Sequence, residues 1–481
     1  MEDNNAMLLE QAQECLSGLF YDLLGKQDVT FESFEQDVLN LGHSVMARAM
    51  SKALEQFDSK LCSNKPNNLH VHDIRQRTLA SMLGDLHFIY RRLRDEYGNT
   101  RVLFAEALDL GWGVRVTPAA VSYLENAGAC VSFAQAAELL VQAGGSAVSD
   151  TTVMNAIHTA GRLCKAEDEQ AAIDLYRDGV VPDAEGQTDV LCVEADGTWI
   201  NLQNVSEDEP KRVEIKAFVA YAGKDSQDAK TARIQPIRHG CVGTPDEFWT
   251  QAVAAMAKRF DLSKLKTCHL GTDGESWCKS GGSYIPCATE GHLDPFHVNR
   301  AILSCFSTDN KAIAKRILRV LAQGETDNVI ALMRACRALG LTKKGADKVI
   351  KYLENNKELI AKAGPSLGTM EAENQHVYGA RMDSVPCGWS REGASAMARI
   401  RSRRASNIAL PRRTRDQSIT RKRRRAQEKR IETYLLHKVD TKVPTSVGSG
   451  YEYPHQANTD QLSAQIHYTA GVDTGMIAIN G

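Results

Sequence analysis

The sequence lacks a long hydrophobic run and carries little net charge. None of its apolar runs approaches the roughly 20 residues that a membrane-spanning helix needs. The opening Met1-Glu-Asp-Asn is not the start of a secretory signal. The formal net charge is −2 over 481 residues, of which 43% are hydrophobic. We therefore expect a cytoplasmic protein with no membrane partner and with more than one domain.

The sequence also lacks paired cysteines. Its 12 cysteines are scattered, and no two of them form a Cys-x-x-Cys pair. The spacing indicates neither a zinc ribbon nor a disulfide framework, and most of the thiols are expected to be buried and free. Basic residues crowd near the C-terminus, so the remainder of the chain must be acidic. Such asymmetry is typical of proteins that bind nucleic acid.

One stretch organises the chain: Val190-Leu-Cys-Val-Glu-Ala-Asp-Gly-Thr-Trp-Ile200. Its first four residues are apolar and predict a buried strand, which delivers Asp196 followed by Gly197. The missing side chain of Gly197 would let an ion or ligand approach the backbone. A carboxylate at the exit of a buried strand is costly unless a metal or a hydrogen-bond network receives it. Taken alone, however, the stretch is explained equally well by an Asp-Gly turn that closes a hairpin.

A second copy of the same pattern favours a site over a turn. The residues from Leu265 to Gly274 form another short apolar strand that ends in Asp273 and Gly274. Between the two copies, the sequence predicts strands over 212–222 and 231–238 and a helix over 245–260. The second of these strands should lie at an edge, because Pro236 cannot donate to a ladder. Two carboxylates separated in this way can lie side by side in one sheet.

A third carboxylate follows a long helical stretch. Residues 300–363 are predicted to be helical throughout, as an inserted subdomain that ends at Gly364-Pro365. The next predicted helix carries Glu371 and Glu373, which are about 200° apart, so only one can face the metals. Glu371 shares its face with polar residues, and we predict it to be the ligand. Glu373 is then expected to lie near DNA or solvent.

These carboxylates predict a particular chemistry. Asp196, Asp273 and Glu371 supply hard oxygen ligands without any His/Cys set, which suits Mg²⁺ or Mn²⁺ better than zinc. Like charges brought close together need cations to hold them. Two such ions can activate a water or a 3′-hydroxyl and stabilise the leaving oxygen of a phosphodiester. His297, in Leu293-Asp-Pro-Phe-His297, is either an orienting residue or a satisfied structural histidine.

Other parts of the chain indicate a DNA partner. The region before residue 70 is predicted to be helical, and Gly84-Asp85 joins a predicted hairpin. Helices near 133–142 and 151–164 resemble a helix-turn-helix, and 166–189 reads as an acidic connector. Beyond residue 398 the chain turns basic, and such an arm either tracks a phosphate backbone or is solvated; its arginine density favours phosphate. The predicted DNA contacts are Arg399, Arg401, Arg403, Arg404, Arg421, Lys422, Arg423, Arg424 and Arg425.

A series of motifs resembles a known family. They run from Glu194-Ala-Asp-Gly-Thr-Trp199 through Gly271-Thr-Asp-Gly-Glu-Ser-Trp277 and Leu293-Asp-Pro-Phe-His297 to Met370-Glu-Ala372, Arg381-Met382 and Gly388-Trp-Ser-Arg-Glu-Gly-Ala394. In this order, over about residues 70 to 430, they resemble the ISLre-type insertion-sequence transposases, which are also catalogued as a family of uncharacterised proteins. The chain departs from that pattern in Val385-Pro-Cys387 and in its near-neutral charge.

The resemblance implies an α/β protein with a ribonuclease-H-like core and an Asp-Asp-Glu triad. It makes Asp196 and Asp273 the first two ligands and places Asp294 and His297 in the family's Asp-x-x-His segment. Its glutamate stands about ten residues before the motif arginine, which is Glu371 before Arg381. The expected segments are an N-terminal helical region (1–70), a hairpin and helix-turn-helix-like DNA-binding region (71–165), the core (186–300 and 366–398) with its helical insertion (301–365), a basic arm (399–440) and a loose tail (441–481).

The expected function is transposition: metal-dependent cleavage and joining of DNA strands at the element ends. The expected partners are the terminal inverted repeats and target DNA, bound by a homo-oligomer associated with the nucleoid. One alternative is a DNA-binding relic or repressor with a defunct core, against which the three intact carboxylates argue. Another is a carboxylate-pair glycosidase, which would give the basic arm no purpose.

Overall fold

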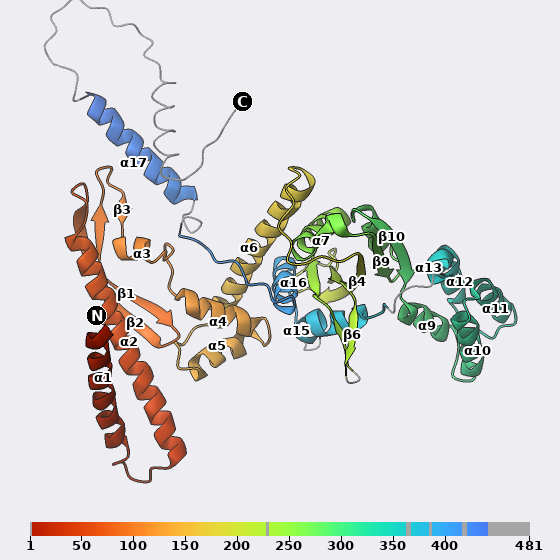
Figure 1. The fold of residues 1–481 in the computed structure, drawn as a ribbon, viewed down its shortest axis with the longest axis horizontal. Helices are drawn as coiled ribbons and strands as arrows, with labels where there is room; N and C mark the ends of the chain where they lie inside the picture. The colour runs from red at the N-terminus through yellow and green to blue at the C-terminus, as the bar shows by residue number, and fades with distance from the viewer. Residues whose placement is uncertain (1, 228–229, 362–366, 384–386, 416–420, 441–481) are drawn as a thin grey trace, which may run out of the picture. The chain divides into compact units, whose positions relative to one another are not determined.

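The computed structural model describes residues 2–227, 230–361, 367–383, 387–415 and 421–440 (Figure 1). The chain forms two compact units. One comprises Met1–Tyr123, Ala137–Val148 and Arg413–Gly481, and the other comprises Leu124–Ala136 and Ser149–Arg412. The predicted DNA-binding region 71–165 is therefore divided between the two units. No helix within the described ranges is long and apolar enough to cross a membrane.

The first unit packs long helices against a small antiparallel sheet. Helices α1 (Glu2–Leu23) and α2 (Phe31–Ser63) precede β1 (His70–Ser81), β2 (Gly84–Arg94), β3 (Thr100–Arg101) and α3 (Leu103–Ala107). The predicted antiparallel pairing of β1 with β2 is confirmed, but the turn lies at Met82-Leu83 rather than at Gly84-Asp85, because Gly84 pairs with Ser81 and Asp85 with Ala80. Gly84 has a positive φ of 98°, which permits the tight turn. Leu86, Phe88 and Phe104 form the centre of the core beneath α2.

The second unit is built on a five-stranded mixed sheet of order β10-β9-β4-β5-β8. Strands β4 (Val190–Asn201), β5 (Arg212–Tyr221) and β8 (Ile237–Cys241) pair antiparallel, whereas β9 (Thr267–Thr272) and β10 (Ala288–Leu293) run parallel to β4. The predicted single strand over 231–238 is wrong. Strand β7 (Lys230–Arg233) pairs with β6 (Lys224–Gln227), and β8 begins only after Pro236, which has no N–H to offer a continuous ladder.

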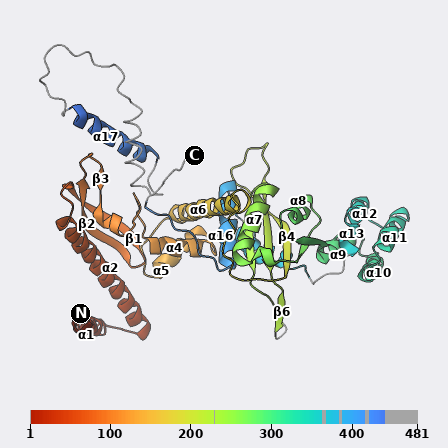
Figure 2. The ribbon, with the colours of Figure 1, turned by 45° about the horizontal axis from the view of Figure 1, so that its top comes forward.

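Alternate side chains of the central strands enter two cores. Leu191, Val193 and Ala195 pack with α7 (Pro245–Arg259). Cys192 lies in the opposite core, to which α6 (Asp150–Tyr176) and α16 (Arg391–Ala405) contribute side chains. Figure 2 shows this sheet with its covering helices after rotation. The alternation follows from the period of two along a strand and places helices on both faces of the sheet.

A helical insertion follows β10. It contains α9 (Pro295–Ser304), α10 (Lys311–Ala322), α11 (Thr326–Ala338), α12 (Ala346–Asn355) and α13 (Lys357–Ala361) and has its own apolar core. This confirms the predicted helical stretch as far as Ala361, while its predicted end at Gly364-Pro365 lies outside the described residues. Helix α9 begins at Pro295 because Asp294 caps it and proline suits the first turn. Figures 1 and 2 both show the insertion beyond β10.

The predicted acidic connector over 166–189 is wrong in its first part. Helix α6 begins at Asp150 after its Ser149 cap, close to the predicted start, but it continues to Tyr176. It continues because Glu167 and Asp168 form ion pairs with arginines of α16. The acidic residues of this segment therefore belong to a packed helix rather than to a linker. The helix α5 (Phe133–Gln142) is confirmed.

Candidate carboxylate site at the strand ends

The two predicted aspartates follow the last residue pair that joins two adjacent parallel strands. β4 and β9 are parallel neighbours, and their final pair is Ala195 with Thr272. Asp196 and Asp273 come next. Asp196 does not end its strand as predicted, since β4 continues to Asn201 by pairing with β5. The hairpin interpretation of Asp196-Gly197 is therefore excluded, and the β4–β5 connection lies over residues 202–211.

The two glycines after these aspartates serve different purposes. Gly274 has a φ of +97°, a conformation that other residues rarely adopt, and it turns the chain away from β9. Tyr352 of α12 donates its hydroxyl to the Asp273 carbonyl at 2.9 Å, so the insertion holds this turn. Gly197 is explained by packing instead, because a Cβ there would collide with the Glu214 carboxylate. The space beside Gly197, where an ion was predicted to approach, is thus occupied by the Glu214 side chain.

Glu371 is the third carboxylate that the structure brings to this place. It lies on α14 (Met370–Glu373), which continues into a π-helical segment over Asn374–Gly379 and α15 (Ala380–Met382). Asp196, His297 and Glu371 each offer a ligand atom, and these atoms all lie within 4.8 Å of one another. Asp273 is outside that group of three. Its charge nevertheless acts on Asp196 strongly enough to shift the pKa of that neighbour.

The surroundings of Asp196 disfavour its ionised form. Its side chain is buried, and it accepts hydrogen bonds from the Gly197 N–H at 2.8 Å and the Asn374 amide at 2.9 Å. Burial, followed by the charge of Asp273, raises the pKa of Asp196 to about 6. His297, whose Nε2 lies 3.8 Å from Asp196 Oδ2, acts in the opposite direction. The site therefore concentrates negative charge that its own hydrogen bonds do not fully stabilise.

The two predicted supporting residues join β9, β10 and α9. Asp294 caps α9 by accepting the Phe296 N–H at 2.8 Å, and its own N–H donates to the Thr272 carbonyl at 2.8 Å. Burial raises the pKa of Asp294. His297 Nε2 is 4.0 Å from Asp294 Oδ2, so the imidazole is close to the carboxylates of both Asp294 and Asp196. Of the two predicted roles for His297, this geometry favours orienting a carboxylate.

Glu373 lies in a different environment, and its predicted location near DNA or solvent is wrong. Its side chain is buried, and its two carboxylate oxygens lie 2.6 and 3.1 Å from the Arg238 guanidinium. It also forms an ion pair with Arg233. Because two arginines occupy this carboxylate, it is not available to the site. Glu371, by contrast, is exposed.

Sequence reasoning missed the role of Glu194. Only 2% of this residue is exposed, and one carboxylate oxygen accepts the N–H groups of Gly368 and Thr369, both at 2.7 Å. The other oxygen accepts the hydroxyls of Tyr221 and Thr369, both at 2.6 Å. These bonds anchor the backbone just before Glu371. The signal in the sequence is a glutamate two residues before Asp196 on the same face of an otherwise apolar strand.

The structure corrects the first part of the predicted basic arm. Arg399 is 3% exposed and forms an ion pair with Asp168, and Arg403 binds Asp168 at 2.8 Å and Glu167 at 2.7 Å. These side chains are engaged inside the unit, because α16 packs between α6 and β8 with small residues at its contacts. Arg399 and Arg403 are therefore not available to contact DNA.

The other predicted arginines fall into two groups. Arg401 donates to backbone carbonyls, including that of His376 at 2.8 Å, and Arg404 binds Asn126 and the Cys130 sulfur. These two are also held by the protein. Helix α17 (Arg421–Asp440) carries the remaining predicted contacts. The side chains of Arg421 and Lys422 lie outside the described residues, Arg423 lies over the Trp112 ring at 3.5 Å from its centroid, and Arg424 and Arg425 are exposed.

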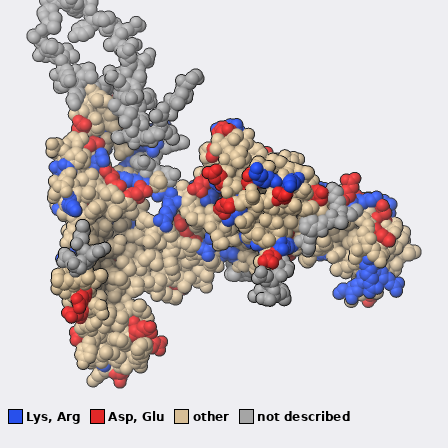
Figure 3. All heavy atoms as spheres, in the orientation of Figure 1, with Lys and Arg blue, Asp and Glu red and all other residues tan. Residues whose placement is uncertain are grey.

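A cationic surface that the sequence reasoning missed lies on α10. Lys311, Lys315, Arg316 and Arg319 are all exposed, and the helix contains no acidic residue. Figure 3 shows Lys and Arg gathered at the lower right, over α10. Lys311, Lys315 and Arg319 are four residues apart, so they lie along one side of the helix, whereas Ala314 and Ile317 are buried.

Sequence comparisons give the affiliation of the chain. A protein of Caldanaerobacter subterraneus subsp. tengcongensis is 23% identical over 400 residues, which is 80% of each chain, and its name carries eleven locus labels. A Streptococcus gallolyticus protein named for the region 3′ of vanSb is 22% identical over 383 residues, 76% of this chain and 80% of its own length. Both are named UPF0236 proteins. The model of the Uncharacterised protein family (UPF0236) matches residues 24–415, and the chain belongs to that family.

Proposed function

We propose that the second unit is the DNA-cleaving and strand-joining core of a transposase and that Asp196, Asp273 and Glu371 hold its metal ions. The observation that carries this proposal is the arrangement of three carboxylates. Two of them follow the last residue pair that joins β4 to β9, and Glu371 reaches within 4.8 Å of Asp196. Burial, and after it the like charge of Asp273, raises the pKa of Asp196.

The donor set fits Mg²⁺ or Mn²⁺. Carboxylate oxygens are the ligands that these ions prefer, and charge that burial destabilises is what a divalent cation relieves. When bound, two such ions would activate an attacking hydroxyl and stabilise the leaving oxygen of a phosphodiester. The chain's own residues prepare the site: Asn374 holds the Asp196 carboxylate, and Glu194 anchors the backbone before Glu371.

The sheet supports interpreting this unit as ribonuclease-H-like. Its first three strands form an antiparallel series, and the last two return parallel to the first strand on the other side. The first and fourth strands therefore lie side by side, which brings Asp273 near enough to Asp196 for its charge to raise the pKa of Asp196. The helical insertion stands between the last strand and the segment with Glu371, as the resemblance implies.

Two further observations support a mobile element that acts on DNA. The same unit presents the exposed cations of α10, and exposed lysines and arginines free of acidic neighbours on their helix suit a phosphate backbone. The relative whose name carries eleven locus labels is encoded, by that name, at many places in one genome. Repetition of this kind is what a transposing element leaves behind.

The test is strand cleavage by the purified full chain. The substrate is duplex DNA carrying the sequences that flank its gene, with Mg²⁺ or Mn²⁺ in one arm and EDTA in the other. Asp196→Asn and Asp273→Asn are expected to abolish cleavage and leave DNA binding unchanged. Asp309→Asn, which alters an exposed carboxylate of the insertion, is the matched control and should retain activity.

Binding in the same experiment separates the proposal from its main alternative. Replacing Lys311, Lys315, Arg316 and Arg319 with Ala should weaken binding and flatten its salt dependence, by roughly 0.9 log unit per decade of salt for each lost phosphate contact. Normal cleavage by either Asn variant would overturn the metal-ligand assignment. Binding without cleavage in either metal would instead favour a catalytically defunct DNA-binding relic.

A further inference from the structure

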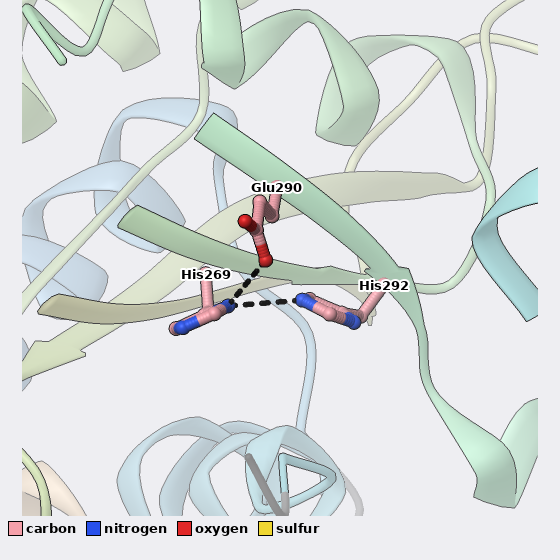
Figure 4. Close-up of side chains that lie close together, drawn as sticks. All are labelled: His269, Glu290 and His292. Carbon is pink, nitrogen blue, oxygen red and sulfur yellow. Dashed lines mark hydrogen bonds and ion pairs between the residues drawn. The ribbon is translucent and has the colours of Figure 1, made fainter. Parts of the chain in front are cut away.

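A second group of potential ligands lies on β9 and β10, away from the carboxylate site. His269 of β9 is paired in register with Glu290 of β10, and His292 follows two residues later. Side chains two residues apart on a strand share a face, so all three project from the same side of the sheet. Figure 4 shows the His269 ring at one side of the group, with dashed lines from its Nδ1 to the Glu290 carboxylate and to the His292 ring.

We infer that His269, Glu290 and His292 form a binding site for a transition-metal ion, with Zn²⁺ as the best-fitting class. His269 Nδ1 lies 3.1 Å from His292 Nε2 and 3.4 Å from Glu290 Oε2. The ligand atoms of the three residues all lie within 4.8 Å of one another. In a tetrahedral zinc site with bonds of about 2.0–2.1 Å, two ligand atoms stand roughly 3.3–3.4 Å apart. The separations of Nδ1 from the other two atoms are therefore already close to those that zinc requires.

Hydrogen bonds among the three residues cannot satisfy all of the close contacts between their ligand atoms. The Nδ1 atom of an imidazole carries at most one hydrogen, yet it faces both His292 Nε2 and the Glu290 carboxylate. One proton cannot satisfy both contacts fully, whereas a cation accepts electron pairs from all three atoms at once. The cluster is therefore better matched to a metal ion than to a shared proton.

The ligand types select the metal. Two imidazoles and one carboxylate suit Zn²⁺ and related divalent ions and give little preference for Mg²⁺. His292 is buried and the His269 side chain is 16% exposed, so the strand backbone and neighbouring side chains hold both rings. The Glu290 side chain is 52% exposed, which leaves one side of the ion open to water. Three protein ligands and one open position characterise zinc sites that retain a water.

This site is distinct from the carboxylate site, although it shares a strand with it. His269 precedes Asp273 by four residues, or about 13 Å of extended chain. An ion held by the cluster would join β9 to β10, whose last residues, Thr272 and Leu293, immediately precede Asp273 and Asp294. Zinc binding would therefore fasten together the two strands that lead into the carboxylate site. The inference does not depend on the proposed DNA chemistry.

The test is metal binding by the metal-free full chain in excess Mg²⁺, followed by Co²⁺ absorbance in the visible range and by Zn²⁺ calorimetry. The wild type should bind one equivalent of Co²⁺ that Zn²⁺ displaces. His269→Ala and His292→Ala should raise the Kd for Zn²⁺ by at least ~100-fold, because the loss of an outer-shell partner already costs 10- to 100-fold. His87→Ala, which changes an exposed histidine of β2, is the matched control.

Two further variants keep the outcome decisive. Glu290→Gln alters a half-exposed side chain and should keep its melting temperature while binding Zn²⁺ more weakly, even if a histidine variant fails to fold. Asp196→Asn should bind Zn²⁺ like the wild type. The inference is overturned if the wild type binds no equivalent of Zn²⁺ or Co²⁺. It is also overturned if binding survives in His269→Ala and His292→Ala or is lost only in Asp196→Asn.

Discussion

Two aspartates of the second unit, both largely shielded from solvent, have opposite surroundings. Asp168 on α6 lies between Arg399 and Arg403. Burial alone would raise the pKa of Asp168, yet neighbouring charges lower it below its usual value. His239 is one of these neighbours, but burial lowers its own pKa to about 3, so at neutral pH the arginines supply the positive charge. At Asp196, by contrast, burial and the charge of Asp273 act together and raise the pKa.

The difference distinguishes a carboxylate that the protein neutralises itself from one that we propose to be functional. Burying a charge is costly, and a protein normally places an opposite charge beside it. The Asp168 site meets this requirement with its own arginines and therefore needs nothing from outside. The Asp196 site gathers further carboxylates instead, and we propose that a cation from solution stabilises it. Both sites lie in one unit, so the contrast arises from the charges of the side chains next to each aspartate.

The largest expected effect is a loss of stability at the Asp168 site, where arginines pair with the carboxylate. Arg399→Ala would leave Asp168 short of one partner in a buried place, and breaking a buried pair in this way costs about 3–5 kcal/mol. The free energy of unfolding, measured by urea denaturation, should fall by that amount. Arg404→Ala, on the same helix but bound to Asn126, is the matched control and should cost less than half as much. A loss below about 1 kcal/mol for Arg399→Ala would mean that solvent replaces the arginine and that the contrast is false.

The two neighbouring glutamates give the second test, because each belongs to one of the two kinds of site. Glu371→Gln should lower the cleavage rate by roughly 100-fold or more, equivalent to about 3 kcal/mol, and leave stability unchanged. Glu373→Gln should do the reverse, since it leaves Arg238 and Arg233 without their carboxylate. Rates per folded molecule and urea midpoints measure the two effects. If Glu373→Gln lost activity at full stability, the choice between the glutamates would be wrong.

The sequence revealed the parts of the site that depend on local pattern. An apolar strand followed by Asp-Gly can be recognised within ten residues, and two copies separated by a suitable length predict adjacent strand ends. The phase of one helix sufficed to separate Glu371 from Glu373, because residues two apart face different sides. The continuation of β4 past Asp196 could not be seen, since it depends on pairing with β5.

The fate of the arginines could not be predicted from local pattern. Arg399 and Asp168 are 231 residues apart in sequence, and only the packing of α16 against α6 brings them together. A run of basic residues looks the same whether its charges meet phosphate or internal carboxylates. His269 and His292 present the same difficulty at shorter range, because their spacing of 23 residues becomes meaningful only in the parallel register of β9 and β10.

The smallest expected effect concerns the Asp196 site. Here the substitution should raise the free energy of unfolding, whereas Arg399→Ala should lower it. A raised pKa means that folded Asp196 keeps its proton between about pH 4 and pH 6, where the unfolded chain has released it. Asp196 therefore lowers stability progressively as pH rises through this window, and the full penalty of about 1–3 kcal/mol is present above it.

Asp196→Asn removes the charge, so in EDTA at pH 7.5 it should be more stable than the wild type by that amount. The two proteins should converge near pH 4, and Mg²⁺ at pH 7.5 should stabilise the wild type more than the variant. Urea midpoints at both pH values measure the gap, and a gap that is absent at pH 7.5 or equally large at pH 4 would show that the Asp196 charge is already compensated by the protein.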